Sequence, residues 1–85
     1  MPNETSSAKA PANETRANEI QIVVNGEHRN IAAGATVTDL LAALALPPGR
    51  VAIERNLEIL PRPEWPDTRI QPADRYEIVH FVGGG

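Results

Sequence analysis

Large apolar side chains are nearly absent before Ile20 and frequent after it. In residues 1–19 the only large apolar side chain is Met1, and the other residues are mostly small or polar. Such a segment buries too little apolar surface to offset the entropy lost on ordering, so we expect residues 1–19 to form a disordered tail. A folded domain is therefore expected over residues 20–82, followed by a flexible glycine tail at residues 83–85.

The domain is predicted to open with a β-hairpin. Apolar residues alternate along its first strand, at Ile20, Ile22 and Val24, which is the spacing of one buried strand face. The dipeptide Asn25-Gly26 follows directly and is typical of a type I′ turn. Residues 27–31 are therefore expected to return antiparallel to the first strand.

A single amphipathic helix is predicted after the hairpin. Thr36 and Asp39 resemble a capping box, with aspartate in place of the usual glutamate or glutamine. The spacing i, i+3, i+4, i+7 puts four apolar side chains on one stripe facing the sheet: Val37, Leu40, Leu41 and Leu44. The prolines after Leu46 end the helix, so Leu46 is about its last possible residue.

Three further strands are predicted after the helix. Residues 51–53 (VAI) and 58–60 (EIL) are predicted as two short strands, and residues 75–82 form the last strand after a turn. The prolines of residues 61–71 exclude a central strand there. Trp65, in the same segment, is expected to close the core from the side as a structural residue.

Both faces of the last predicted strand have apolar side chains. Tyr76 and Ile78 alternate with Glu77, Val79 and Phe81. One helix covers only one face of a sheet, so the second face is either exposed, which would favour docking of a partner, or covered by loops.

Composition argues against several functional classes. The formal net charge is -3 and the arginines alternate with acidic residues, so no nucleic-acid interface is expected. Cysteine is absent, which excludes disulfides, thiolate metal sites and iron–sulfur clusters. His28 and His80 are the only histidines and form no metal-ligand pattern, so we expect no metal site. No apolar run reaches the length of a membrane span, and a cytoplasmic protein that does not bind membranes is expected.

The run Gly83-Gly84-Gly85 follows the last predicted strand and has two interpretations. Glycines lack a Cβ and lose much entropy on ordering, so the run is typical of a flexible end. The same lack of side chains allows a tail to enter a narrow channel and present the carboxylate of Gly85 to an enzyme.

The predicted order β-β-α-β-β-β, with a chain end projecting from the last strand, is that of the β-grasp fold. This is an α+β fold with a mixed sheet of about four to five strands packed on one helix. The final run EIVHFVGGG resembles the end of the ThiS family, the ubiquitin-like sulfur carrier proteins of thiamine biosynthesis. The resemblance covers residues 20–85 and extends to VNG at 24–26, TVTDLL at 36–41 and VAIERN at 51–56.

This resemblance implies a protein cosubstrate without catalytic activity of its own. An E1-like adenylyltransferase of the ThiF type uses ATP to adenylate the carboxylate of Gly85. A sulfur donor such as a cysteine desulfurase then converts the adenylate to a thiocarboxylate, 1-thioglycine. Thiazole synthase of the ThiG type takes the sulfur, and no cofactor is implied beyond this covalent sulfur.

The resemblance also assigns roles within the tail. Gly83 and Gly84 are expected to provide reach and a slim profile, and Phe81 and Val82 are expected to anchor the last strand against a partner. The segment before Glu19 is a departure, because the typical family member lacks it.

Three alternatives stay open at the level of the sequence. The small subunit of molybdopterin synthase uses the same thiocarboxylate chemistry with a different partner. A ubiquitin-like modifier would instead leave isopeptide-linked lysine adducts. A plain interaction module would have a frayed glycine end and bind through its folded surface alone.

Overall fold

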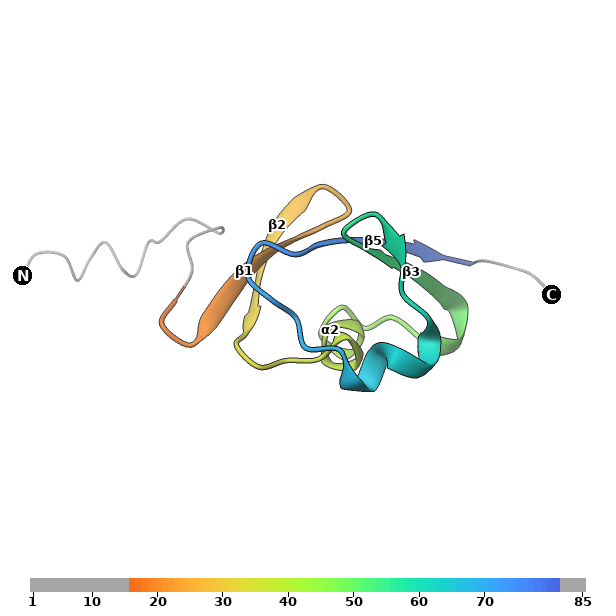
Figure 1. Cartoon of the computed structure of the whole chain (residues 1–85), viewed down its shortest axis with the longest axis horizontal. Coiled ribbons are helices and arrows are strands. Elements are labelled where there is room, and N and C mark those ends of the chain that lie inside the picture. Colours follow the sequence, from red (N-terminus) through yellow and green to blue (C-terminus); the bar gives the residue numbers. More distant parts are fainter. Residues whose placement is uncertain (1–15, 82–85) are drawn as a thin grey trace, which may run out of the picture.

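The computed structural model describes residues 16–81, and the predictions for residues 1–15 and 82–85 lie outside this range. The described elements follow the predicted order β-β-α-β-β-β (Figure 1). The strands are β1 (Glu19–Val24), β2 (Glu27–Ala32), β3 (Val51–Arg55), β4 (Glu58–Ile59) and β5 (Arg75–His80). The helix is α2 (Val37–Ala43), and two 3₁₀ helices are η1 (Pro48–Arg50) and η2 (Arg62–Asp67). Strand β1 begins one residue before the predicted start.

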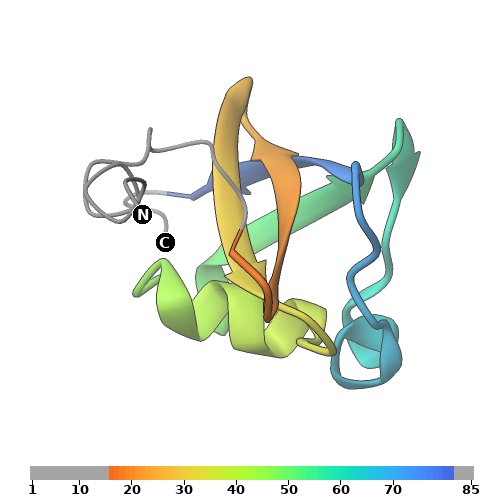
Figure 2. The same ribbon diagram turned by 90° about the vertical axis from the view of Figure 1, so that its left-hand side faces the viewer.

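The strands form one mixed sheet in the order β2-β1-β5-β3-β4. Strand β5 runs parallel to β1 and antiparallel to β3, so the last strand in the sequence is the central strand of the sheet. Helix α2 and η2 lie on the same side of this sheet (Figure 2). This is the β-grasp arrangement, and the predicted fold class is confirmed.

The first hairpin forms as predicted. Asn25 and Gly26 both have positive φ, 50° and 84°, as a type I′ turn requires. Val24 and Glu27 are register partners on either side of the turn. Ile22 and Val24 are buried, which confirms the core face of the first strand.

The predicted capping box of α2 is also present. The Asp39 N–H donates to Thr36 Oγ1 at 3.2 Å, and the Thr36 N–H donates to Asp39 Oδ2 at 2.9 Å. Both otherwise unpaired donors are thereby satisfied at the helix start. The apolar stripe faces the core, with Val37, Leu40 and Leu41 buried and Leu44 partly buried.

Helix α2 ends at Ala43, before the limit expected from the prolines. Ala45 takes a left-handed conformation with φ 58°. Its N–H donates to Ala42 O, and the Leu46 N–H donates to Leu41 O, both at 3.0 Å. This is the Schellman pattern of helix ends, here with alanine in the position that usually has glycine. The chain therefore leaves the helix before it reaches the prolines.

Trp65 lies in η2 and is buried against the core, as predicted. Its indole N–H donates to Leu60 O at 3.0 Å. The Arg62 guanidinium carbon lies 4.8 Å from the centre of the Trp65 rings, which is cation–π geometry. These contacts support a structural role for the tryptophan.

Candidate functional site

The described part of the predicted site is the base of the tail, at Phe81. This residue follows β5 directly, and its N–H donates to Arg50 O at 2.7 Å. Its side chain is half-exposed. The other predicted site residues, Val82, Gly83, Gly84 and Gly85, lie outside the described range.

Strand β5 is held along both edges. On one side it pairs with β3 over a five-residue register, from Val51↔His80 to Arg55↔Tyr76. On the other side, main-chain hydrogen bonds join Val23 N–H to Asp74 O at 2.9 Å and Asn25 N–H to Tyr76 O at 2.8 Å. The strand leading to the tail therefore has the position of a central strand.

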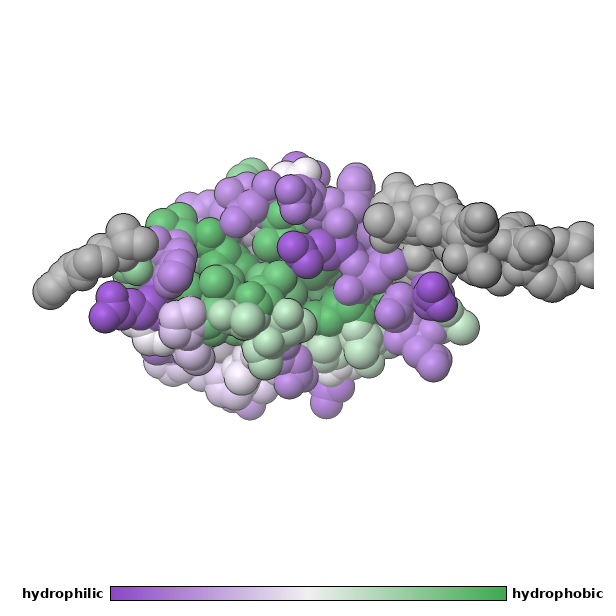
Figure 3. Space-filling view, turned by 180° about the vertical axis from the view of Figure 1, so that it is seen from behind, coloured by the Kyte–Doolittle hydropathy of each residue, from purple (hydrophilic) through white to green (hydrophobic). Residues whose placement is uncertain are grey.

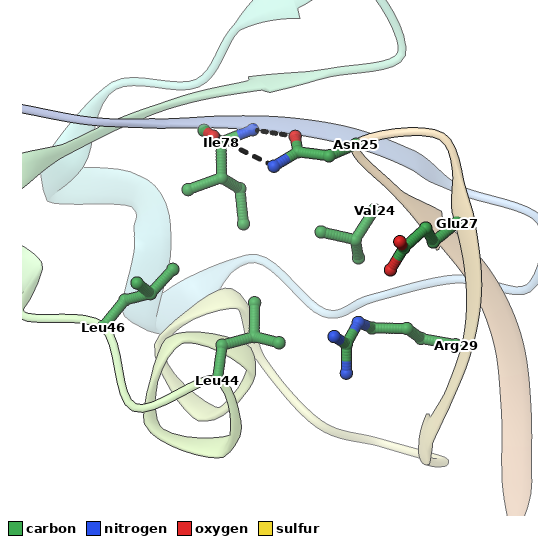
Figure 4. Close-up of a pocket in the computed structure, with 7 residues that line it drawn as sticks. All are labelled: Val24, Asn25, Glu27, Arg29, Leu44, Leu46 and Ile78. Atoms are coloured by element: carbon green, nitrogen blue, oxygen red, sulfur yellow. Dashed lines mark hydrogen bonds between the residues drawn. The ribbon is translucent and has the colours of Figure 1, made fainter.

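The Asn25 side chain extends the β1 edge by one more step (Figure 4). Its Nδ2 donates to Ile78 O at 3.2 Å, and its Oδ1 accepts from the Ile78 N–H at 2.7 Å. The amide thus replaces a peptide group where β1 has already turned away into the hairpin. Sequence reasoning identified Asn25 only as a turn residue, because its contact with Ile78 depends on the parallel pairing of β1 and β5.

A polar network centred on Asp74 joins the start of β5 to the turn after β3. Asp74 is 5% exposed. Its Oδ2 accepts hydrogen bonds from Arg55 Nε at 3.0 Å, from the Tyr76 hydroxyl at 2.8 Å and from the Gln71 N–H at 3.0 Å. Its Oδ1 accepts from Asn56 Nδ2 at 3.2 Å. The carboxylate is therefore bonded through both oxygens, and Arg55 provides the compensating charge.

This environment sets the protonation states of the network. Burial by itself raises the pKa of Asp74, but its hydrogen bonds from Gln71, Tyr76, Asn56 and Arg55 outweigh burial and lower the pKa below its ordinary value. Burial, and then the hydrogen bond to Asp74, raise the pKa of Tyr76 far above its ordinary value. Tyr76 therefore remains protonated and acts as a donor, and Asp74 remains an anion at neutral pH.

Asn56 completes the link between the two chain segments. It has a left-handed backbone with φ 51°. Its N–H donates to Arg75 O at 2.8 Å, and the Arg75 N–H donates to its Oδ1 at 3.0 Å. In the sequence, Arg55 and Asn56 were matched only through a family resemblance, and Asp74 was placed only in a turn. No local sequence pattern indicated the network, because its members are brought together by the pairing of β3 with β5.

The face of the sheet opposite α2 exposes large apolar side chains near the base of the tail. Leu57 is 86% exposed, Ile59 71%, Val79 58% and Phe81 50%. Of the two interpretations of this face, the exposed one holds for the described residues. Anchoring of a partner by Phe81 stays a prediction.

A hollow with a mixed polar and apolar lining lies on the other side of β5. It has a volume of about 310 Å³, and Glu27 and Arg29 lie at its β2 side (Figure 4). Figure 3 shows apolar surface gathered in the middle of the molecule when it is viewed from behind. The apolar lining of the hollow consists of Val24, Leu44, Leu46 and Ile78.

Neither histidine lies in a cluster of metal-ligating residues. His28 and His80 are both exposed. Within residues 16–81 there is no group of three or more histidine or acidic side chains positioned to hold a metal ion. In the same range no helix has the length and apolar character needed to cross a membrane.

The family model of ThiS matches residues 18–85. The chain belongs to the ThiS family. The ThiS match includes the whole described sheet and the glycine run.

Individual relatives agree with the ThiS assignment. The sulfur carrier protein ThiS of Bacillus subtilis is 44% identical over 50 residues, which cover 59% of this chain and 76% of that protein. The crystal structure of a ThiS thiamine biosynthesis protein from Geobacter metallireducens has a TM-score of 0.67 and 33% identity, covering 78% of this chain and 100% of that one.

Longer relatives contain a ThiS-like stretch. A thiazole synthase from Paramagnetospirillum magneticum is 44% identical over 66 residues. This alignment covers 78% of the present chain and 20% of the thiazole synthase. The chain therefore spans about a fifth of the length of that enzyme.

Proposed function

We propose that this ThiS-family protein is a sulfur carrier for thiazole formation in thiamine biosynthesis. The observation that supports this most is the family match, because it runs through the glycine tail as well as the folded domain. The Bacillus subtilis relative named as a sulfur carrier agrees with it. The protein then acts as a cosubstrate of other enzymes and has no catalytic activity of its own.

The reactive group is the carboxylate of Gly85. A carboxylate is a poor acyl donor, because its charge is delocalised over two oxygens and oxide is a very poor leaving group. In an E1-like enzyme of the ThiF type, a carboxylate oxygen attacks the α-phosphorus of ATP and pyrophosphate leaves. The terminal sulfur of a persulfide on a donor such as a cysteine desulfurase then displaces AMP from the carbonyl carbon, which yields an acyl disulfide. A thiol reductant cleaves its S–S bond and is itself oxidised to a disulfide, which releases the thiocarboxylate on Gly85.

The thiocarboxylate delivers its sulfur while it is covalently attached to the protein. Tethering gives the sulfur nucleophile a high effective concentration at the acceptor and prevents its loss as free sulfide. The fixed base of the tail supports this role, because β5 is paired on both edges and the Phe81 N–H is bonded to Arg50 O. The acceptor is thiazole synthase of the ThiG type, and the carrier returns as the free carboxylate.

The decisive experiment is the intact mass of the full chain after incubation with ATP, an active E1-like enzyme and a sulfur source. Exchange of one oxygen for sulfur adds about 16 Da, and this gain is lost when thiazole synthase and its substrates are added. An unchanged mass beside a demonstrably active E1-like enzyme contradicts the proposal. Sulfur that only molybdopterin synthase consumes, or lysine-linked adducts, would instead support one of the alternatives.

A further inference from the structure

The outer face of the sheet has a groove of about 520 Å³ between β3, β4 and β5. Its apolar lining includes Leu57, Ile59 and Val79, all exposed to solvent. Helix α2 lies on the opposite face, so no helix among the described residues covers this one. Contiguous exposed apolar surface of this kind marks interaction sites.

Two glutamates line the same groove and oppose each other. Glu54 of β3 is the direct register partner of Glu77 of β5. Like charges directly opposite one another on a sheet face are destabilising. Within residues 16–81 neither carboxylate has an ion-pair partner, although Arg75 precedes Glu77 by two residues on β5. The groove therefore has uncompensated negative charge beside its apolar surface.

Leu57 lines the groove and has a strained backbone conformation. It has a left-handed conformation with φ 73° in the turn between β3 and β4, where glycine is the usual residue. Its side chain is 86% exposed, so no burial within the described part of the domain offsets this strain. Strain retained without a local packing gain points to a function in contact with another molecule.

We infer that this groove docks thiazole synthase, and that the enzyme places an arginine or lysine between Glu54 and Glu77. This inference rests on the proposed function. The cation relieves the repulsion between the two carboxylates, and its aliphatic stem packs on Val79. Apolar side chains of the enzyme lie against Leu57 and Ile59.

The choice of thiazole synthase follows from the longer relatives. The Paramagnetospirillum magneticum enzyme includes, in its own polypeptide, a stretch 44% identical to this chain. A domain of this kind and a thiazole synthase are thus joined in that protein. Where the two are separate chains, a docking surface replaces the covalent connection.

The test is the affinity of the full chain for thiazole synthase, measured by calorimetry at low and high salt. Glu54→Gln and Glu77→Gln are each expected to weaken binding about fivefold at low salt and to reduce its salt dependence. Each is also expected to raise the melting temperature by about 2 °C or more, because one of the opposed charges is gone. Leu57→Gly is expected to stabilise the fold and to weaken binding.

Two control variants separate docking from general effects. Glu58→Gln makes the same change in charge outside the groove lining. Ala45→Gly relieves a left-handed alanine, φ 58°, also outside the groove. Both controls are expected to bind thiazole synthase like the original chain.

Two results would overturn the inference. One is that Glu54→Gln and Glu77→Gln bind as tightly as Glu58→Gln. The other is that the unmodified chain shows no binding to thiazole synthase in calorimetry. The gain of about 16 Da at Gly85 is measured without thiazole synthase, so sulfur loading can be established even where this docking fails.

Discussion

Asp74 shows how much of this structure depends on a single buried carboxylate. Its oxygens accept hydrogen bonds from Arg55, Asn56, Gln71 and Tyr76, which come from three different parts of the chain. Its lowered pKa means that the folded state favours the anion. By linkage, this stabilisation is present above the pKa of the unfolded chain and is lost as the pH falls through the lower pKa of the folded state.

We therefore expect Asp74→Asn to destabilise the domain by about 2–3 kcal/mol at pH 7, because an amide is uncharged and cannot accept these bonds through both atoms. Lowering the pH protonates the original carboxyl group, so the difference between the two proteins is expected to shrink as the pH falls below about 4. Urea unfolding at pH 7 and at about pH 3 measures both values. A difference that stays constant with pH would refute the role of the anion.

At Gly84, an alanine substitution tests whether the tail must lack side chains in order to enter the activating enzyme. We expect Gly84→Ala to fold normally but to be adenylated about 10- to 100-fold more slowly, because its added methyl group obstructs the channel of the activating enzyme. Gly49→Ala is the matched control, since a Cβ there meets nothing within 4 Å. Pyrophosphate release by the E1-like enzyme gives the rates, and equal rates for the two variants would exclude the steric argument.

Among the elements, β5 is held in part by a side chain, because the Asn25 amide makes the main-chain hydrogen bonds that a neighbouring strand would make. The Asn25 amide holds Ile78 where β1 has turned away. Because Asn25 has φ 50°, glycine can take its place without backbone strain. A substitution can therefore remove the amide and keep the turn.

We expect Asn25→Gly to lower the free energy of unfolding by about 1–2 kcal/mol, through the loss of two hydrogen bonds. Hydrogen exchange at the Ile78 amide is expected to become faster, because its acceptor is gone. Asn25→Asp keeps an acceptor for this amide and should retain part of its protection. Exchange at Ile78 that is the same in all three proteins would show that the contact does not hold the strand.

At the scale of the whole molecule, the folded domain is expected to be stable without its reactive end. Deletion of Gly84 and Gly85 is expected to leave the melting temperature unchanged. The affinity for thiazole synthase is expected to stay within about twofold of that of the full chain, since the proposed docking groove is on the sheet. The same deletion is expected to abolish the gain of about 16 Da. Retention of that mass gain would place the reactive group elsewhere.

Local rules were sufficient to predict most of the fold. Three confirmed predictions depend only on residues close together in the sequence. They are the Asn25-Gly26 turn, the Thr36–Asp39 capping box and the apolar stripe of α2. The Asp74 network and the Asn25 amide contact were not predicted, because their partners are brought together only by the pairing of β5 with β1 and β3. The reactive tail was inferred from the pattern of its residues and from family resemblance, and it stays a prediction.

The parallel pairing of β1 and β5 has a mechanical consequence. The chain enters β1 at one end of this pair and leaves β5 at the other. Traction on Phe81 against Arg16 therefore loads the two strands in shear. The bonds from Val23 to Asp74, from Asn25 to Tyr76 and between Asn25 and Ile78 then bear the force together, rather than opening one after another. Force applied between Arg16 and Phe81 thus acts along the strands and not across them, so that it does not peel β5 from β1.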